Sequence, residues 1–268
     1  MTLSDFHLHT NVSFDGEACA EEMCAAVLRL GLSGAALTDH VEMVDYEKDG
    51  IGRVVLRARE TAEEAREKFR GRLPVAVGIE MGEPLFNLTL AQEILNYPYD
   101  FVLASVHRLG EEPDYYFQDF KGTDIAAEMT RYFDEAARTV AWGRFHALAH
   151  LTYPFRYIPK YIPAEKCHAD YSLWQDQIDA IFKKMAGTGL ALEINTSGLR
   201  GQLGLTQPDL PLIKRFRELG GERITLGSDA HRPEDVGAGL RAAAALAAAA
   251  GFRYTCSYYK GEPVMSAL

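Results

Sequence analysis

Hydrophobic residues in this chain are concentrated in short runs, and longer stretches with helical periodicity separate the runs. Seven apolar runs predict β-strands at residues 3–9, 34–40, 74–81, 101–107, 145–151, 190–197 and 223–231. The helical periodicity predicts helices at residues 17–30, 53–70, 88–96, 123–142, 172–187, 208–219 and 233–250. Glycines such as Gly189 and Gly220 stand where helices would end, which is typical of helix C-caps. Strand and helix therefore alternate along the chain.

This alternation favours a parallel sheet. Seven strands with polar residues at their carboxyl ends favour an α/β barrel, in which that end carries the active site. The chain has 268 residues, which is a usual length for one such barrel, and no linker rich in proline, glycine or serine divides it. We therefore predict a single domain over residues 1–268, with a short additional strand at residues 254–259.

Two stretches interrupt the alternation. Residues 111–122 and 152–171 are long, aromatic and contain proline. Loops of this length at the functional end of a barrel commonly form lids or substrate walls. We therefore expect both loops to border the active site.

Histidines and carboxylates stand at the carboxyl ends of the predicted strands. They are His7, His9, His40, Glu80, His107, His150, Asp229 and His231. Residues two apart on a strand point to the same face, which places His7 beside His9. The same spacing places Asp229 beside His231. Because imidazole and carboxylate groups are common ligands of divalent metals, their convergence at one rim predicts a metal centre.

The ligands divide into three groups, one for each of three divalent ions. The expected groups are His7, His9 and Asp229; Glu80, His107 and His150; and Asp15, His40 and His231. Glu80 is able to bridge two of the ions. Three N or O ligands on an ion leave a position for water. The sequence does not distinguish zinc, manganese and iron, because histidine and carboxylate suit all three.

For four further polar residues, a structural or solvent-exposed role is the alternative to a role in the site. Asp15 also fits a turn, although we expect it to bind metal. Asp39 would face away from the metal ligands, which favours a supporting role. His146 lies deeper on its predicted strand and is expected to be structural, and His168 is expected to be solvated in a loop.

These motifs resemble those of the PHP (polymerase and histidinol phosphatase) superfamily. The matching segments are His7-Leu8-His9, Thr38-Asp39-His40, Gly78-Ile79-Glu80, Ser105-Val106-His107, His150 and Gly227-Ser228-Asp229-Ala230-His231. The resemblance implies a distorted (β/α)7 barrel with a trinuclear metal centre. The chain length and the segment Glu193–Arg200 are similar to those of the stand-alone histidinol-phosphate phosphatases of this superfamily. The segment 151–154 departs from the His-Pro-Asp-like pattern that is frequent there.

The resemblance implies a metal-dependent phosphomonoesterase, and L-histidinol phosphate is the substrate that we predict. Metal coordination lowers the pKa of water from 15.7 to about 7 and so supplies a nucleophile. Arg156 and Arg200 follow strand-end motifs and are suited to bind phosphate oxygens. The candidates for protonating the leaving alcohol are Asp229, His231 and a metal-bound water.

Residues at the strand ends and in the long loops are candidates for contact with the leaving group. The polar candidates for its cationic group are Asn195, Glu193, Asp114 and Asp119. The aromatic candidates for stacking on its imidazole are Tyr115, Tyr116, Phe117 and Tyr153.

The net charge of −10 argues against nucleic acids and anionic membranes as partners. A small phosphate ester remains compatible, because metal ions and arginines reverse the field locally. Three alternatives stay open: a PHP phosphoesterase acting on another small ester or nucleotide, a phosphotyrosine phosphatase, and a non-catalytic metal-binding module. The complete ligand set argues against the last.

The remaining features favour a cytoplasmic protein. The four cysteines are scattered and fit reduced thiols, at Cys19, Cys24, Cys167 and Cys256. The first metal ligands stand within the first strand, so we expect no signal peptide. No apolar stretch approaches the roughly 20 residues of a membrane span. The oligomeric state is not readable from the sequence.

Overall fold

The computed structural model describes residues 2–45, 51–161 and 171–268. Its parallel strands are β1 (Asp5–Leu8), β2 (Ala35–Leu37), β3 (His40–Glu42), β4 (Val75–Gly82), β5 (Phe101–Ser105), β6 (Ala147–Leu148), β7 (Ala191–Asn195) and β8 (Ile224–Gly227). Its helices are α1 (Ala20–Arg29), α2 (Ile51–Lys68), α3 (Leu88–Ile94), α4 (Ile125–Trp142), α6 (Gln175–Thr188), α7 (Leu210–Glu218) and α8 (Leu240–Ala249). The predicted alternation of strand and helix is confirmed.

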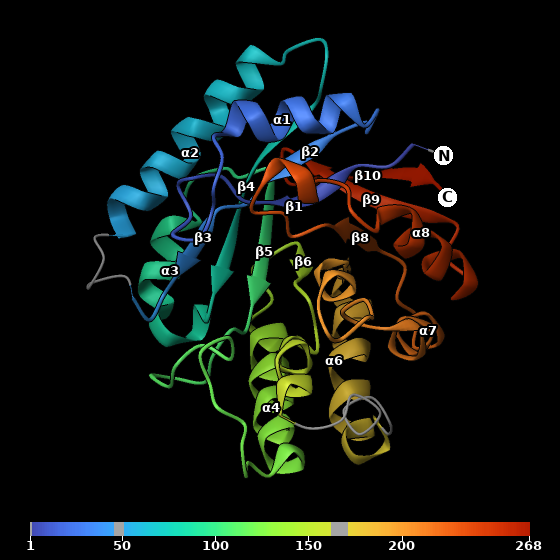
Figure 1. The fold of residues 1–268 in the computed structure, drawn as a ribbon. Coiled ribbons are helices and arrows are strands. Elements are labelled where there is room, and N and C mark those ends of the chain that lie inside the picture. The colour runs from blue at the N-terminus through green and yellow to red at the C-terminus, as the bar shows by residue number, and fades with distance from the viewer. Residues whose placement is uncertain (1, 46–50, 162–170) are drawn as a thin grey trace.

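The strands form one parallel sheet in the order β1-β2-β4-β5-β6-β7-β8. The sheet nearly closes on itself, because Leu8 of β1 forms a parallel bridge with Ala230 beyond β8. The His9 amide donates to the Ala230 carbonyl at 2.9 Å across this seam. Helices surround the strands (Figure 1), and the fold is the predicted seven-stranded α/β barrel. In the described part of the chain, no helix combines the length and apolar character needed to cross a membrane.

The second predicted strand, residues 34–40, is divided into β2 and β3. Both pieces pair with β4, and His40 lies opposite Glu80. Asp39 stands between the two pieces, and its carboxylate accepts hydrogen bonds from the Thr10 amide at 2.6 Å and from the Ser13 hydroxyl at 2.7 Å. The interruption therefore ties the loop after β1 to the second strand. This agrees with the supporting role expected for Asp39.

The strands β6 and β8 end earlier than predicted, just before residues of the expected metal centre. His150 and Asp229 have positive φ angles of 22° and 54°, and Thr152 has a φ of 84°. Such backbone is unfavourable for residues other than glycine and is typically found where function constrains the chain. The chain leaves the sheet at these residues, and the side chains of His150 and Asp229 turn toward the barrel axis.

A C-terminal hairpin closes the opposite end of the barrel. It consists of β9 (Tyr254–Tyr259) and β10 (Glu262–Ala267), so the single strand predicted at residues 254–259 has an antiparallel partner. Tyr258 is buried and stacks on Phe101 at a centroid distance of 5.2 Å. Small residues at the beginnings of the strands leave space for this packing, at Ala36, Ala76, Ala147 and Ala191. The barrel interior is therefore solid at its amino end.

We predict that Tyr258→Ala lowers the free energy of unfolding by about 3–5 kcal/mol, because it opens a cavity beneath the barrel. Urea denaturation at fixed metal content measures the loss. Tyr254→Ala on the same strand is the matched control, since Tyr254 is 47% exposed. Equal losses in the two variants would contradict the role of the hairpin as a packed closure.

Candidate metal centre

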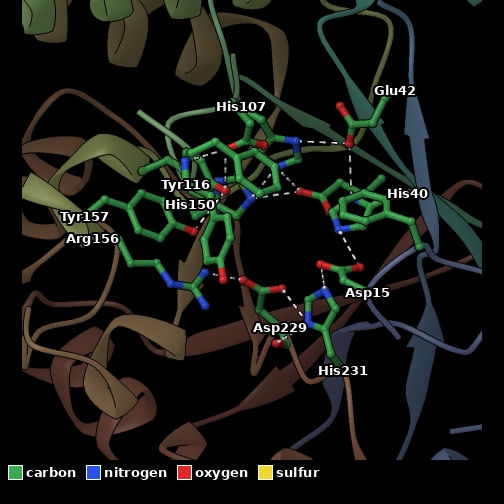
Figure 2. Close-up of a pocket in the computed structure, with 15 residues that line it drawn as sticks. Asp15, His40, Glu42, His107, Tyr116, His150, Arg156, Tyr157, Asp229 and His231 are labelled. Carbon is green, nitrogen blue, oxygen red and sulfur yellow. Dashed lines mark hydrogen bonds and ion pairs between the residues drawn. The ribbon is translucent and has the colours of Figure 1, made fainter. Parts of the chain in front are cut away.

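The residues at the carboxyl ends of the strands surround a cavity of about 360 Å³. Figure 2 shows histidines and carboxylates from different strands pointing into it. The metal ligands that line the cavity are Asp15, His40, Glu80, His107, His150, Asp229 and His231. His7 and His9 lie beneath them and are fully buried. The structure thus brings all nine predicted ligands to one site.

Glu80 on β4 is the centre of this site. Its Oε2 lies 3.2 Å from His7 Nε2 and 3.0 Å from His40 Nδ1. Its Oε1 lies 2.8 Å from His150 Nε2. His9 and His107 approach the same carboxylate at 3.5 and 3.2 Å. One carboxylate therefore contacts five imidazoles, a geometry that suits a bridging ligand.

Four groups of three side chains place their ligand atoms within 4.8 Å of one another. They are His7, His9 and Asp229; His7, Glu80 and His150; His9, His40 and His231; and His40, Glu42 and His107. The first is a group expected from the sequence, and the others combine the ligands differently. Within the described chain, His9 Nε2, His40 Nδ1 and His231 Nε2 are buried and face carboxylate oxygens at 3.0–3.5 Å without forming an aligned hydrogen bond. Buried nitrogen and oxygen atoms that converge without aligned hydrogen bonds fit a site that is completed by metal ions.

Burial opposes protonation of His7, His40 and His107, but the neighbouring carboxylates hold their pKa values well above the usual range, so metal binding would release protons from them. Burial opposes ionisation of Glu80, but His7, His107 and His40 together hold its pKa well below the usual range. Burial, reinforced by His231 and His40, lowers the pKa of His9 to about 3. A neutral imidazole next to an ionised carboxylate is the state that binds a divalent cation.

Glu193 on β7 holds two of the ligands from behind. Its Oε1 lies 2.6 Å from His7 Nδ1, and its Oε2 accepts a hydrogen bond from the His150 amide at 2.8 Å. A Cβ at Gly227 would lie 2.2 Å from Glu193 Oε1, so only glycine leaves room for this carboxylate. Glu193 therefore orients imidazoles, as carboxylates behind metal-bound histidines commonly do. The expectation that it contacts the substrate cation is corrected.

Glu42 is a site residue that the sequence reasoning missed. Its Oε1 lies 3.2 Å from His40 Nδ1 and 3.1 Å from His107 Nδ1. A Cβ at Gly82 would lie 2.1 Å from Glu42 Oε2, so a glycine again makes room for the carboxylate. The signal was present in the sequence, because His40 and Glu42 are two apart on one strand, just as His7 and His9 are.

Asp15 closes the site at its mouth. Its carboxylate lies 3.1 Å from His231 Nε2 and 3.7 Å from His40 Nε2. Burial would raise its pKa, but the contacts with His231 and His40 prevail and lower it to about 2. Its side chain is 41% exposed, more than that of any other ligand for which an ion pair is described. This places the third expected group, Asp15 with His40 and His231, next to solvent.

Both predicted arginines contact Asp229. Arg156 on η2 (Tyr153–Arg156) lines the cavity and donates from Nη1 to Asp229 Oδ2 at 3.0 Å. Arg200 on η5 (Ser197–Arg200) donates from Nη2 to the Asp229 carbonyl at 3.0 Å. The Arg156 side chain therefore faces the cavity, whereas Arg200 is not among the residues that line it. A phosphate contact by Arg200 stays a prediction.

Two residues expected to touch the substrate are occupied elsewhere. The Asn195 side chain is fully buried, and its Oδ1 accepts hydrogen bonds from the amide and the hydroxyl of Ser197. Tyr115 is fully buried, and its hydroxyl donates to Glu128 at 2.9 Å. Neither lines the cavity, and a substrate contact by Asn195 or Tyr115 stays a prediction. The sequence pattern of the strand and the loop did not indicate which of their side chains face the cavity.

Other candidates from the two long loops do line the cavity. They are Asp114, Tyr116, Phe117 and Tyr153. Asp119 is exposed and caps the Lys121 amide at 2.9 Å, so it does not reach the cavity. His146 accepts a hydrogen bond from the Val102 amide at 2.8 Å, as its structural role requires. His168 and Cys167 lie outside the described residues.

Taken together, the closed parallel barrel and the cluster around Glu80 define an α/β-barrel protein with a histidine- and carboxylate-rich centre at the carboxyl ends of its strands. Residues 5–197 match the PHP domain family, and the chain belongs to this family. Outside the matched segment, Asp229 and His231 complete the same site.

Three comparisons with relatives agree with this membership. A protein of Thermotoga maritima named as a probable histidinol-phosphatase is 30% identical over 88% of this chain and 87% of its own length. The histidinol-phosphatase of Lactococcus lactis is 28% identical over 95% of this chain and 93% of its own. The solved structure of histidinol phosphate phosphatase from Lactococcus lactis, in complex with zinc, L-histidinol and phosphate, has the same fold. It is 23% identical, with a TM-score of 0.79 and coverage of 98% and 99% of the two chains.

We predict that Glu42→Gln weakens metal binding by about 10- to 100-fold, because an amide replaces an anionic side chain that contacts two ligands. Competition with a chelator, followed by elemental analysis, measures the change. Glu111→Gln is the matched control, since this exposed residue undergoes the same charge change outside the cavity. Equal metal affinity in the Glu42→Gln and unaltered proteins would remove Glu42 from the site.

Proposed function

We propose that this protein is a metal-dependent phosphomonoesterase that hydrolyses L-histidinol phosphate to L-histidinol and phosphate. The observation that carries the proposal is the cluster around Glu80, which faces a small cavity that also contains Arg156. Such a cavity offers metal ligands, a guanidinium for phosphate and little room for a large substrate. The names of the relatives from Thermotoga maritima and Lactococcus lactis support histidinol phosphate as the substrate.

The centre would hold three divalent ions. The ligands would be His7, His9, Asp15, His40, Glu42, Glu80, His107, His150, Asp229 and His231. Zinc is bound in the related Lactococcus lactis structure, and manganese and iron also suit these nitrogen and oxygen donors. When bound, the ions supply an activated water nucleophile and neutralise the charge of the phosphoryl group.

The side chains around Asp229 would bind and orient the phosphate. Burial opposes ionisation of Asp229, but His7, His9 and Arg156 hold its pKa well below the usual range, so it stays an anion. An anionic Asp229 orients Arg156 through their 3.0 Å contact and leaves the other guanidinium nitrogens for phosphate oxygens. Arg200 would reach the phosphate from behind Asp229. An anionic Asp229 has no proton to give to the leaving alcohol, which argues against Asp229 as the general acid.

The size and the walls of the cavity favour a small ester. The lining includes Tyr116, Phe117, Tyr153 and Tyr157, which enclose the side away from His40. A phosphotyrosyl peptide or a nucleic-acid end would need an open approach. A cytoplasmic location and a small-molecule partner remain part of this proposal.

We predict that the purified protein, loaded with Mn²⁺, Zn²⁺ or Fe²⁺, releases phosphate from L-histidinol phosphate, and that His9→Ala and Glu80→Ala lower this activity by more than about 10³-fold. A phosphate-release assay with a panel of small esters measures both. Circular dichroism verifies that each variant is folded. Normal turnover after complete removal of metal would refute the proposal, and about three metal equivalents per chain are expected in the active protein.

We predict that Arg156→Met lowers kcat/KM by about 10²- to 10³-fold, because the guanidinium contacts phosphate oxygens in the transition state. Arg156→Lys keeps the charge but loses the forked geometry, so its activity should lie between the two. Metal content is measured in parallel, since Arg156 also contacts the ligand Asp229. An unchanged kcat/KM at normal metal content would show that Arg156 does not bind phosphate.

A further inference from the structure

Asp114 differs from the other carboxylates in the cavity. Five carboxylates line it, at Asp15, Glu42, Glu80, Asp114 and Asp229. Each of the others has a histidine or arginine nitrogen within 4 Å. Among the described residues, Asp114 forms no ion pair. Asp114 is half-buried, and a carboxylate that loses part of its hydration without a cationic partner is destabilised unless a ligand supplies the partner.

The carboxylate of Asp114 is held in a defined position. Its Oδ1 accepts hydrogen bonds from the Tyr116 amide at 2.7 Å and from the Tyr153 hydroxyl at 3.2 Å. The Tyr157 hydroxyl in turn donates to the Tyr153 oxygen at 3.0 Å. No hydrogen bond to Asp114 Oδ2 is formed by any residue that the structure describes. One oxygen is therefore fixed, and the other is available to a ligand.

This carboxylate lies on the wall of the cavity beyond Tyr153. The Tyr153 ring is 4.9 Å from the rings of both His107 and His150, and its hydroxyl reaches Asp114. Asp114 is thus separated from the metal ligands by the length of one tyrosine side chain. Figure 2 shows Tyr157 beside Arg156, across the cavity from Asp15 and His40.

The basic groups around Asp114 are engaged elsewhere. His107 and Arg108 act on its charge, but His107 Nδ1 lies 3.1 Å from Glu42 and Arg108 pairs with Asp45 at 2.8 Å. Arg156 pairs with Asp229 at 3.0 Å. Lys160 Nζ lies over the rings of Tyr116 and Tyr157, at 5.2 and 5.1 Å from their centroids. Burial raises the pKa of Asp114, as expected for a carboxyl group with few compensating contacts. A ligand cation would restore the missing charge pairing.

We infer that Asp114 is the specificity-determining residue that binds the ammonium group of the leaving alcohol. This inference rests on the proposed function. An ammonium group presents three N–H donors, and one of them would form a charge-assisted hydrogen bond with Oδ2. The metal centre would hold the phosphate at one end of the substrate, and Asp114 would hold the amine at the other. The site then selects phosphate esters of amino alcohols over esters of neutral alcohols.

The test compares Asp114→Asn with the unaltered protein, both loaded with metal. Asparagine can still accept the hydrogen bonds from the Tyr116 amide and the Tyr153 hydroxyl, so the loop should keep its conformation. We expect kcat/KM for L-histidinol phosphate to fall by about 10²-fold, mainly through KM. For p-nitrophenyl phosphate, whose leaving group has no cation, we expect a change of less than about 2-fold. Glu111→Gln, on the same loop, should behave as the unaltered protein with both esters.

Calorimetric binding of L-histidinol provides a readout that does not depend on catalysis. Its affinity should fall by a similar factor in Asp114→Asn. Equal losses with both esters, or no loss with either, would overturn the inference. If the unaltered protein does not hydrolyse L-histidinol phosphate at all, the proposed function fails. The preference for an ammonium group is then measured with phosphoethanolamine and ethyl phosphate, and an equal kcat/KM for these two esters would overturn the inference separately.

Discussion

The site depends on one buried carboxylate. Glu80 contacts five imidazoles, and without its charge these rings would face one another in a space from which water is excluded. His9 already stacks on His231 and His40 at centroid distances of 4.1 and 4.2 Å. An anion at the centre makes such crowding of basic groups tolerable, because it offsets their mutual repulsion whenever one of them is protonated. The same anion is what makes the cluster attractive to several cations at once.

The barrel supplies the rigidity that this arrangement needs. His7, His40, Glu42 and Glu80 lie within strands, so the register of the sheet sets their mutual distances. The other predicted ligands, apart from Asp15, follow shortly after strand ends. The hairpin packs Tyr258 beneath the barrel and keeps the strand beginnings in place. Glycines at positions 82 and 227 leave room for Glu42 and Glu193, which hold imidazoles from behind. Strain in the backbone of His150 and Asp229 is sustained because the strands on either side are firmly packed.

Most of the fold and the convergence of the predicted metal ligands could be predicted from the sequence, because both follow from periodic patterns. A strand has a period of two, so His7 and His9 had to share a face, and the carboxyl ends of parallel strands had to meet. Glu42 obeys the same rule and was missed only because the strand that carries it is interrupted at Asp39. Asn195 and Tyr115 are buried away from the cavity for a different reason: which side of an irregular segment faces the cavity depends on packing against Glu128 and Ser197, which no local pattern encodes.

The predicted metal ligands and the walls of the cavity come from different parts of the chain. The strands and their carboxyl ends contribute most of the predicted metal ligands, and residues 5–197, which carry those up to His150, match the PHP domain family. The loops contribute Asp114, Tyr116 and Tyr153, and their segments are the ones that interrupt the regular alternation of the chain. A barrel of this kind can therefore change its substrate by changing its loops while the metal chemistry stays intact. The Tyr153 ring connects the two parts, because it packs on His107 and His150 with its face and fixes Asp114 with its hydroxyl. A substrate that spans both ends of the cavity would be aligned by that single side chain.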